Sequence, residues 1–544
     1  MSDVYVLGVD MIKFGRFPDR SVPNIGAEAA LMALDDAGLT MKDVQAFYCG
    51  NLFQANAMVG QRILQEIGQT GIPVVNCSNA CATGAAAFRE AWMSIKAGMY
   101  DVVLAVGVEQ MGKGLLGGTG DGDGIPKEGL LGSGTMPCVF AEAGMEHSSK
   151  YGTTFEQFAK ISVKNHHHST LNPKAMYQIE TPLDDVMNAE MISYPNTKLM
   201  CSVNVDGSAA AILVSEKKAK ELGMQRAIKV RASALASDPY TDRDLVMPDV
   251  NACTRLAAKD AYEQAGLGAE DINLVELHDC FATAEMLHYE NLGLCEDGEA
   301  GRMIDEGHVE LGGKIPVNVS GGLLSKGHPI GATGIANIYE VCSHLRGEAG
   351  KRQVEGAKIG MTHVIGLGTA CAVHILEKPW IILLIGVTGD THNNLKNISK
   401  ICDLFNQANP SLVIHTGDIT LPKSLAAFSK LKMPLIGVFG NNDEFEKKGL
   451  IEEAKKFNCN FFDEPHKIEI DEKKIIITHH PELINEEMFC DADFILHGHT
   501  HRHRSELIKN TLVFNPGECA GILKGKNNIG LIDTEKKMSE IIHF

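Results

Sequence analysis

The first 378 residues contain a stretch that occurs twice. Residues 30–44 (ALMALDDAGLTMKDV) match residues 258–272 (AKDAYEQAGLGAEDI), and both predict an amphipathic helix that ends at a glycine, then a turn and an apolar strand. A second pair, residues 82–84 and 332–334 (both Ala-Thr-Gly), follows in the same order, and each opens an apolar helical stretch. Two repeats in one order predict a duplicated α/β unit with a pseudo-twofold axis.

A change of composition near residue 378 predicts a second, unrelated part of the chain. Before this point Ala, Gly and Met are abundant and Arg is regular, whereas Ile, Lys and Asn rise after it. The chain of 544 residues is also too long for a single core. We therefore expect three domains, at residues 1–220, 221–378 and 380–544. Only Glu377-Lys378-Pro379 separates the two parts, which suggests a fusion, natural or engineered.

Charge and cysteine usage narrow the classes of partner and the cellular setting. The formal charge of −19 argues against a nucleic-acid groove or an anionic membrane surface as the main partner. The 14 cysteines lack the tight repeated spacing of a disulfide scaffold. The first residues do not resemble a signal peptide, and the longest apolar run, residues 380–387, is too short to span a bilayer. We expect a soluble, cytoplasmic protein that binds neither nucleic acid nor membrane.

Three motifs of the first part carry residue types with catalytic chemistry. Cys81 lies in the sequence NCSNACATG, between an expected strand and an Ala-rich helix, whose positive end favours a thiolate. By itself this pattern suits a small buried cysteine equally well. The motifs HDCF (278–281) and KGHPIGATG (326–334) add His and Cys residues in loops after expected strands, where catalytic groups tend to lie.

Together these motifs resemble the thiolase superfamily, nearest to thiolases of the sterol-carrier-protein type, across residues 1–378. The resemblance implies a duplicated thiolase fold of two βαβαβ-type halves and a coenzyme A thioester as substrate. It also implies that Cys81 is the nucleophile that takes the acyl group. His328 would activate Cys81 and polarise the thioester oxygen, and His278 would contribute to an oxyanion site for the enolate.

One thiolase motif is altered in this chain. Most thiolases carry a Cys-x-Gly motif near their C-terminus, but the matching residues 364–368 read Val-Ile-Gly-Leu-Gly and contain no cysteine. We expect Cys280 to replace it as the acid and base. Gly366 and Gly368 are expected backbone donors of the oxyanion site, and Cys371 is expected to be a structural residue of a packed strand.

Two alternatives to an active thiolase stay open. A ketoacyl synthase also uses one Cys with two His residues, although Cys280 beside His278 and the acidic composition both favour the thiolase. A degenerate scaffold that only binds is the other alternative. The resemblance further implies a homodimer or homotetramer that forms through residues 1–378. It is also compatible with partner proteins of an acyl-CoA pathway.

The last part of the chain alternates short apolar strands with helical stretches, which is α/β periodicity. Strands are expected in residues 381–387, 411–417 and 434–440, and helices near residues 394–407 and 425–430. The later strands follow one another with little helix between them, so we expect an α/β sandwich rather than a Rossmann sheet. Polar clusters follow five strands and can meet at one sheet edge: Asp390-Thr-His392, Gly417-Asp418, Gly440-Asn-Asn-Asp443, Thr478-His-His480 and Gly498-His-Thr-His501.

These clusters resemble the ligand sets of calcineurin-like metallophosphoesterases, specifically the small bacterial and archaeal phosphodiesterases. The resemblance implies a phosphate-ester substrate and two divalent metals, chosen among Mn, Fe, Ni and Zn, that assist in-line phosphoryl transfer. Asp418 would bridge the two metals. The other implied ligands are Asp390, His392 and His501 for the first metal, and Asn441, His479 and His499 for the second.

Two features limit this interpretation. Many family members carry a His at the position of Asn442, where it helps to protonate the leaving group, so Asn442 favours diesters or good leaving groups over monoesters. A metal-free relic is the alternative, and either part of the chain could be only a scaffold.

The run His166-His-His168 lacks carboxylates at ligand spacing, and we expect a solvated helix or loop face there. The glycine-rich residues 114–124 lack the context of a nucleotide-binding fingerprint.

Overall fold

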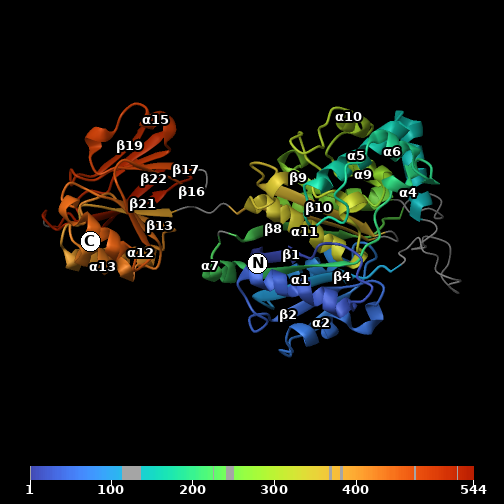
Figure 1. Cartoon of the computed structure of the whole chain (residues 1–544), viewed down its shortest axis with the longest axis horizontal. Coiled ribbons are helices and arrows are strands. Elements are labelled where there is room, and N and C mark those ends of the chain that lie inside the picture. Colours follow the sequence, from blue (N-terminus) through green and yellow to red (C-terminus); the bar gives the residue numbers. More distant parts are fainter. Residues whose placement is uncertain are drawn as a thin grey trace. The chain divides into compact units, whose positions relative to one another are not determined.

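A computed structural model of the chain divides into two compact units, Met1–Pro379 (unit 1) and Trp380–Phe544 (unit 2), shown in Figure 1. No helix among the described residues is long and apolar enough to cross a membrane. The structure describes residues 2–112, 136–224, 226–240, 250–366, 370–379, 384–470, 473–523 and 525–544.

Unit 1 is built on a nine-stranded sheet in the order β3-β2-β4-β7-β1-β8-β11-β10-β9. Its first half runs outward from β1 through two antiparallel pairs to β4 and then through parallel pairs to β2 and β3. The second half repeats this pattern from β8 through β11 and β10 to β9, and a parallel bridge between Val275 and Val317 takes the place of the last pair. The predicted duplication is therefore confirmed. The strands are β1 (Val4–Met11), β2 (Ala46–Gly50), β3 (Val74–Cys77), β4 (Val102–Glu109), β7 (Gly207–Ser215), β8 (Ile228–Ala236), β9 (Leu274–Glu276), β10 (Ile359–Gly366) and β11 (Ala370–Glu377), with the small pair β5 (Met191–Ser193) and β6 (Asn196–Thr197) apart from them.

The helices of unit 1 form layers on both faces of this sheet. Alternate side chains of β1 show the arrangement, because Tyr5 and Leu7 pack in one core with α1 and α2, whereas Val4 and Val6 pack in another with α3 and α11. Helices α4, α5, α8 and α9 pack in a further core with side chains of β8, β10 and β11; α4, α5 and α9 are labelled in Figure 1. The helices are α1 (Val22–Ala37), α2 (Val59–Ile67), α3 (Thr83–Lys96), α4 (Met136–Tyr151), α5 (Phe155–Thr170), α6 (Leu183–Asn188), α7 (Glu216–Leu222), α8 (Val250–Ala265), α9 (Ala282–Asn291), α10 (Ala300–Asp305) and α11 (Ile330–Arg346).

The repeated sequence segments have structural reasons. Helices α1 and α8 end at Gly38 and Gly266, both at φ 65°, a left-handed conformation that only glycine adopts without strain. The second repeat marks the contact between α3 and α11. A Cβ atom on Gly84 would lie 2.6 Å from the carbonyl oxygen of Gly331, and one on Gly334 would lie 2.3 Å from the backbone nitrogen of Ala85. The two Ala-Thr-Gly motifs thus let the central helices approach backbone to backbone.

Unit 2 is an α/β sandwich, as predicted. A six-stranded sheet in the order β15-β14-β13-β12-β21-β22 packs on a five-stranded sheet in the order β16-β17-β18-β20-β19, with Val387 and Ile414 of the first sheet against Phe494 and Phe514 of the second. Helices α12, α13 and α14 cover the other face of the six-stranded sheet. The strands are β12 (Leu384–Thr388), β13 (Leu412–His415), β14 (Leu435–Val438), β15 (Cys459–Phe462), β16 (His466–Ile470), β17 (Lys473–Ile477), β18 (Phe494–Leu496), β19 (Arg504–Ile508), β20 (Thr511–Asn515), β21 (Asn528–Asp533) and β22 (Met538–His543); the helices are α12 (Leu395–Ala408), α13 (Pro422–Ala427), α14 (Lys447–Ala454) and α15 (Met488–Asp491).

The expectation of a solvated His166–His168 face is wrong for two of the three residues. They lie on α5, where His167 is exposed but His166 and His168 are buried. His166 Nδ1 contacts the Ser325 hydroxyl at 3.2 Å, and His168 Nδ1 donates to the Asn318 carbonyl at 3.1 Å. Both imidazoles therefore fasten α5 to the segment that precedes the KGHPIGATG motif. The glycine-rich residues 114–124 and Gly368 lie outside the described residues.

Candidate active sites

The thiol of Cys81 lies on a tight turn between β3 and the first residue of α3. The residue before it, Ala80, has φ 48°, a strained conformation for a non-glycine residue. Thr83 holds this turn, because its hydroxyl accepts from the Asn79 backbone N–H at 2.8 Å and donates to the Ala80 carbonyl at 2.6 Å. Gly366, at the end of β10, closes over the same turn, where a Cβ atom would lie 2.6 Å from the Asn79 carbonyl oxygen. The turn therefore projects a buried Cys81 at the start of a helix.

Two histidines from distant segments meet Cys81. The Sγ atom of Cys81 and one ring nitrogen each of His278 and His328 lie within 4.8 Å of one another, and the two imidazole centroids are 5.1 Å apart. All three side chains are buried. The three residues come from three loops that follow strands or open helices, so the duplicated sheet brings them together from positions nearly 250 residues apart in sequence. These are the residues that the sequence motifs selected.

The hydrogen bonds around His328 determine which ring nitrogen carries the proton. Its Nδ1 lies 2.7 Å from the Thr333 hydroxyl, and that hydroxyl donates its own proton to the Pro329 carbonyl at 3.2 Å. The hydroxyl can therefore only accept from Nδ1–H, which leaves Nε2 as a lone pair. Nε2 has no hydrogen-bond partner among the described residues. Burial lowers the pKa of His328 to about 3, so the imidazole is neutral near pH 7.

His278 and Cys280 complete the group. Burial, together with the neighbouring His328 and His288, holds the pKa of His278 well below its usual value, and neither of its ring nitrogens has a hydrogen-bond partner among the described residues. Burial and the adjacent Cys81 thiol raise the pKa of Cys280 well above its usual value. Near pH 7 the site therefore holds two neutral imidazoles and, at Cys280, a protonated thiol.

A buried polar network supports the HDCF segment, and its residues were not found from the sequence. The Asp279 carboxylate accepts from the Leu323 backbone N–H at 2.7 Å and from the Asn165 side chain at 2.8 Å. Asn165 also donates to Glu285 at 2.7 Å, and Glu285 pairs with Lys164 at 2.5 Å. Asp279 thus fastens the loop that carries His278 and Cys280 to α5 and to the Leu323 backbone, and Asn165 links it onward to Glu285 of α9. The only feature of the sequence that pointed to this network was Asp279 itself, an acidic residue between the catalytic candidates His278 and Cys280.

In unit 2, the predicted metal ligands gather at one edge of the two sheets. Each follows the carboxyl end of a parallel strand, where β12, β13 and β14 of one sheet meet β17 and β18 of the other. Five of the seven have positive φ values, which cost about 1–3 kcal/mol each and concentrate at functional sites. They are Asp390 (49°), His392 (43°), Asp418 (59°), His499 (69°) and His501 (53°).

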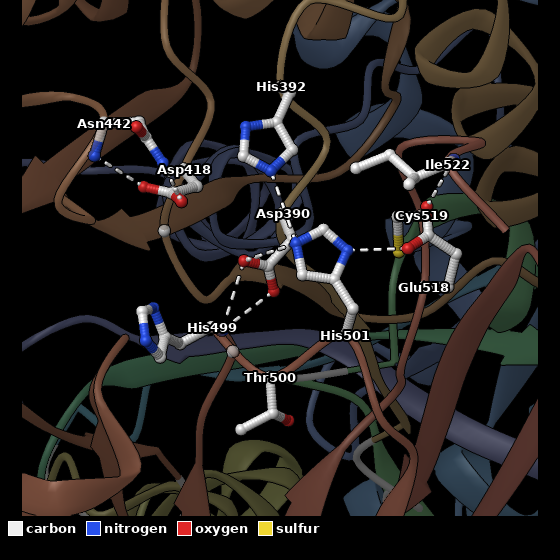
Figure 2. Close-up of polar contacts among 12 residues, drawn as sticks. Asp390, His392, Asp418, Asn442, His499, Thr500, His501, Glu518, Cys519 and Ile522 are labelled. Carbon is white, nitrogen blue, oxygen red and sulfur yellow. Dashed lines mark hydrogen bonds and ion pairs between the residues drawn. The ribbon is translucent and has the colours of Figure 1, made fainter.

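The donor atoms of the first group face one another across short distances. The Nε2 atoms of His392 and His501 are 3.4 Å apart, and Nε2 of His501 lies 3.7 Å from Oδ1 of Asp390 (Figure 2). His501 donates its Nδ1–H to Glu518 at 2.6 Å, which leaves Nε2 as a lone pair. The His499 backbone N–H donates to both carboxylate oxygens of Asp390, at 3.1 and 3.0 Å. Glu518 was not found from the sequence, since it lies outside the strand-end clusters.

The second group centres on His479. Its Nδ1–H donates to the Thr416 carbonyl at 2.9 Å, and its Nε2 lies 3.1 Å from Oδ1 of Asn441 and 3.4 Å from Oδ2 of Asp418. The Nδ1 atom of His499 is 3.3 Å from the same Nε2. Asp418 is common to both groups, because Asp390, Asp418 and His479 also form one cluster within 4.8 Å. This arrangement fits two adjacent metal positions that share Asp418.

Asn442 orients the shared carboxylate. Its backbone N–H donates to Oδ1 of Asp418 at 2.9 Å, and its side-chain amide donates to Oδ2 at 2.7 Å (Figure 2). The neighbouring Asp443 accepts from the backbone N–H groups of Asp418, Thr420 and Gly440. The Gly440–Asp443 loop is thereby held against Asp418 by the residues that the sequence pattern singled out.

The chemistry of these donors fits divalent metals. Imidazole nitrogens and carboxylate oxygens, the ligand types that such metals accept, converge on a small space from several loops. Burial raises the pKa of Asp390 to about 6. Burial alone would lower the pKa of His479, but the Asp418 and Asp390 carboxylates raise it to about 9. Both directions show that the cluster favours added positive charge.

Comparisons with known proteins match family models to both units. Residues 4–184 match the family model of the thiolase N-terminal domain, residues 241–378 match the thiolase C-terminal domain-like model, and residues 383–537 match the calcineurin-like phosphoesterase superfamily domain. The chain is 42% identical over 392 residues to sterol carrier protein 2 of Homo sapiens, which covers 69% of this chain and 72% of the relative. It is 41% identical over 391 residues to acetyl-CoA acetyltransferase of Methanothermobacter thermautotrophicus, which covers 70% of this chain and all of the relative.

Solved structures agree on the fold of unit 1. The Ltp2-ChsH2(DUF35) aldolase superposes with a TM-score of 0.60 at 24% identity and covers 69% of this chain and 98% of its own. Human mitochondrial 3-ketoacyl-CoA thiolase superposes with a TM-score of 0.52 at 17% identity and covers 69% and 98%. The chain therefore belongs to the thiolase family, and after its thiolase part it carries a domain of the calcineurin-like phosphoesterase superfamily.

Proposed function

We propose that unit 1 cleaves and forms carbon–carbon bonds of 3-ketoacyl-CoA thioesters through an acyl-cysteine at Cys81. The convergence of Cys81 with two neutral imidazoles carries this proposal, since Nε2 of His328 is an unpartnered lone pair available to the thiol proton. Acetyl-CoA acetyltransferase and benzoylsuccinyl-CoA thiolase, two relatives by name, act on CoA thioesters, which supports the same class of substrate here.

The residues suggest one order of events in thiolysis. Cys81 Sγ attacks the 3-keto carbon while its proton passes to Nε2 of His328. The C2–C3 bond breaks, and its electron pair forms the enolate of acetyl-CoA, whose oxygen accepts a hydrogen bond from His278. Cys280, held as a thiol by burial, donates its proton to C2. A CoA thiol then attacks the acyl-Cys81 thioester, and its proton restores the Cys280 thiol. The C–S bond to Cys81 breaks, and the released thiolate takes back its proton from Nε2 of His328.

The test is thiolysis of acetoacetyl-CoA combined with trapping of the acyl-enzyme. Cys81→Ala should abolish both thiolysis and labelling by radioactive acetyl-CoA. Cys280→Ala should still become labelled at Cys81 but should lose the carbon–carbon bond chemistry. Thiolysis that survives in Cys81→Ala would refute the proposal, and unchanged turnover in Cys280→Ala would refute the role of the second thiol and return the ketoacyl-synthase alternative.

We propose that unit 2 is a binuclear-metal phosphodiesterase. Asp390, His392, Asp418 and His501 would hold one metal, and Asp418, Asn441, His479 and His499 would hold the other, drawn from Mn, Fe, Ni and Zn. When bound, such a pair supplies an activated water and positive charge for in-line attack on phosphorus. The shared Asp418, fixed by Asn442, is the observation that carries the proposal.

The position of Asn442 favours diesters. An amide cannot protonate a leaving alkoxide, so a good leaving group is required. Hydrolysis of bis-p-nitrophenyl phosphate with and without Mn²⁺ tests this, with Asp418→Ala as the inactive variant. Diester hydrolysis that responds to neither metal nor Asp418→Ala would overturn the proposal.

A further inference from the structure

His480 lies beside the second metal group but outside the predicted ligand set. Its ring centroid is 4.6 Å from that of His499 and 4.8 Å from that of His479. One ring nitrogen from each of these three histidines lies within 4.8 Å of the other two. The side chain of His480 is 30% exposed, so it stands at the open side of the cluster. The sequence placed His480 next to a ligand but assigned it no role.

The Glu464 carboxylate determines how His480 is oriented. Oε1 accepts from His480 Nδ1–H at 2.5 Å. Oε2 accepts from the backbone N–H groups of His479 and His480 at 2.5 and 2.9 Å and from the Thr478 hydroxyl at 2.7 Å. With Nδ1 committed to Glu464, Nε2 is the nitrogen left for any other partner. The whole turn that carries His479 and His480 is thus fixed by one carboxylate.

The same pattern holds for two predicted ligands. His501 donates its Nδ1–H to Glu518, and His479 donates its Nδ1–H to the Thr416 carbonyl, and both present Nε2 to the cluster. Metal-binding histidines ordinarily donate their second nitrogen to a carboxylate or a carbonyl, which fixes the tautomer and increases ligand basicity. His480 with Glu464 repeats this arrangement. A histidine serving only as a surface residue would not need a half-buried carboxylate at Nδ1.

We propose that Nε2 of His480 is an additional ligand of the second metal, alongside Asp418, Asn441, His479 and His499. The inference rests on the proposed two-metal function of unit 2. A third imidazole at this position makes the second metal site richer in nitrogen than the first. Nitrogen-rich sites favour Co²⁺, Ni²⁺ and Zn²⁺ over Mg²⁺ and Mn²⁺, so the second position selects a late transition metal.

The test is Co²⁺ binding by the full chain, read by metal equivalents after gel filtration, by the visible absorption of bound Co²⁺, and by affinity for each equivalent. The wild type should bind two equivalents in unit 2. His480→Ala should keep the first and bind the second about 10- to 100-fold more weakly, with a changed visible spectrum. Glu464→Gln, which keeps the side-chain shape, should weaken the same equivalent. His543→Ala is the matched control, because its Nδ1 also has a side-chain partner, Asn528, but it lies in none of the ligand groups found among the described residues.

The controls separate failure of this inference from failure of the proposed function. Asp418→Ala should weaken both equivalents. If Asp418→Ala does so while His480→Ala and Glu464→Gln keep the wild-type affinity and spectrum, His480 is not a ligand. A raised KM for bis-p-nitrophenyl phosphate with unchanged Co²⁺ binding would assign His480 to the substrate instead and would also overturn the inference. If Asp418→Ala binds Co²⁺ like the wild type, the two-metal function itself is refuted.

Discussion

The hydroxyl of Thr333 makes a quantitative prediction about the nucleophile of unit 1. It is the only described partner of His328 Nδ1, at 2.7 Å, and its onward bond to the Pro329 carbonyl makes it an acceptor. Thr333→Val keeps the shape of the side chain but removes this acceptor. Both side chains are buried, so the freed Nδ1–H loses its partner at a cost of about 1–3 kcal/mol, and the tautomer with Nε2 as a lone pair loses its preference.

If that free energy appears in the transition state, the kcat/KM for acetoacetyl-CoA thiolysis falls about 5- to 150-fold. Alkylation of Cys81 by iodoacetamide, measured by mass spectrometry, should slow in parallel, because it depends on the same transfer of the thiol proton to His328. Thr333→Ser restores the hydroxyl and should recover most of the rate. A Thr333→Val enzyme with wild-type thiolysis and alkylation rates would refute the role assigned to Nε2 of His328.

Three further predictions concern packing, pH and the acid position. Gly334→Ala should lower the melting temperature of unit 1 and its thiolysis rate, because the new Cβ would lie 2.3 Å from the Ala85 nitrogen and must separate α3 from α11; an unchanged melting temperature in calorimetry would contradict this. Acid should destabilise unit 1, because below pH 6.5 the histidines of the unfolded chain take up protons, whereas the buried imidazoles of the folded chain stay neutral, which costs about 2 kcal/mol for each imidazole by pH 5. Burial lowers the pKa to about 3 or 4 in five of them: His168, His288, His328, His344 and His374. Glu109, whose pKa burial raises to about 7, opposes this by about 2.5 kcal/mol over the same range. Burial also raises the pKa of Glu276 and of Asp279, which act in the same direction as Glu109. The buried imidazoles outnumber these three carboxyls, so urea unfolding should show unit 1 less stable at pH 5 than at pH 8, and the reverse order would be inconsistent with the burial. Asn442→His should raise hydrolysis of phosphomonoesters with poor leaving groups by about 100-fold or more, and no gain over the wild type would show that this position does not limit the reaction.

Local patterns in the sequence predicted most of the fold. The helix that ends at Gly38 and its repeat that ends at Gly266 identified the duplication, since both glycines occupy the left-handed position that the pattern requires. In unit 2, polar residues after apolar strands predicted a common edge, and parallel strands do bring Asp390 and Asp418 there. Such predictions succeed because periodicity and strand ends are properties of a few neighbouring residues.

The supporting residues could not be predicted because their roles depend on tertiary contacts. Glu464 and Glu518 are single acidic residues among many, and only the folded sheets place them at the Nδ1 atoms of His480 and His501. The prediction of a solvated face for the histidines of α5 was wrong for the same reason. A polar helix face normally faces water, but His168 here faces a second polar segment, which satisfies its nitrogens in the interior.

We propose that one chain carries two chemically independent enzymes, a thiolase that depends on Cys81 and a phosphodiesterase that depends on Asp418. The most direct measurement assays acetoacetyl-CoA thiolysis and Mn²⁺-dependent bis-p-nitrophenyl phosphate hydrolysis on the same preparations of the wild type, Cys81→Ala and Asp418→Ala. We predict that Cys81→Ala loses thiolysis alone and that Asp418→Ala loses diester hydrolysis alone. A substitution that abolishes both activities, or leaves both intact, would contradict the independence of the two enzymes.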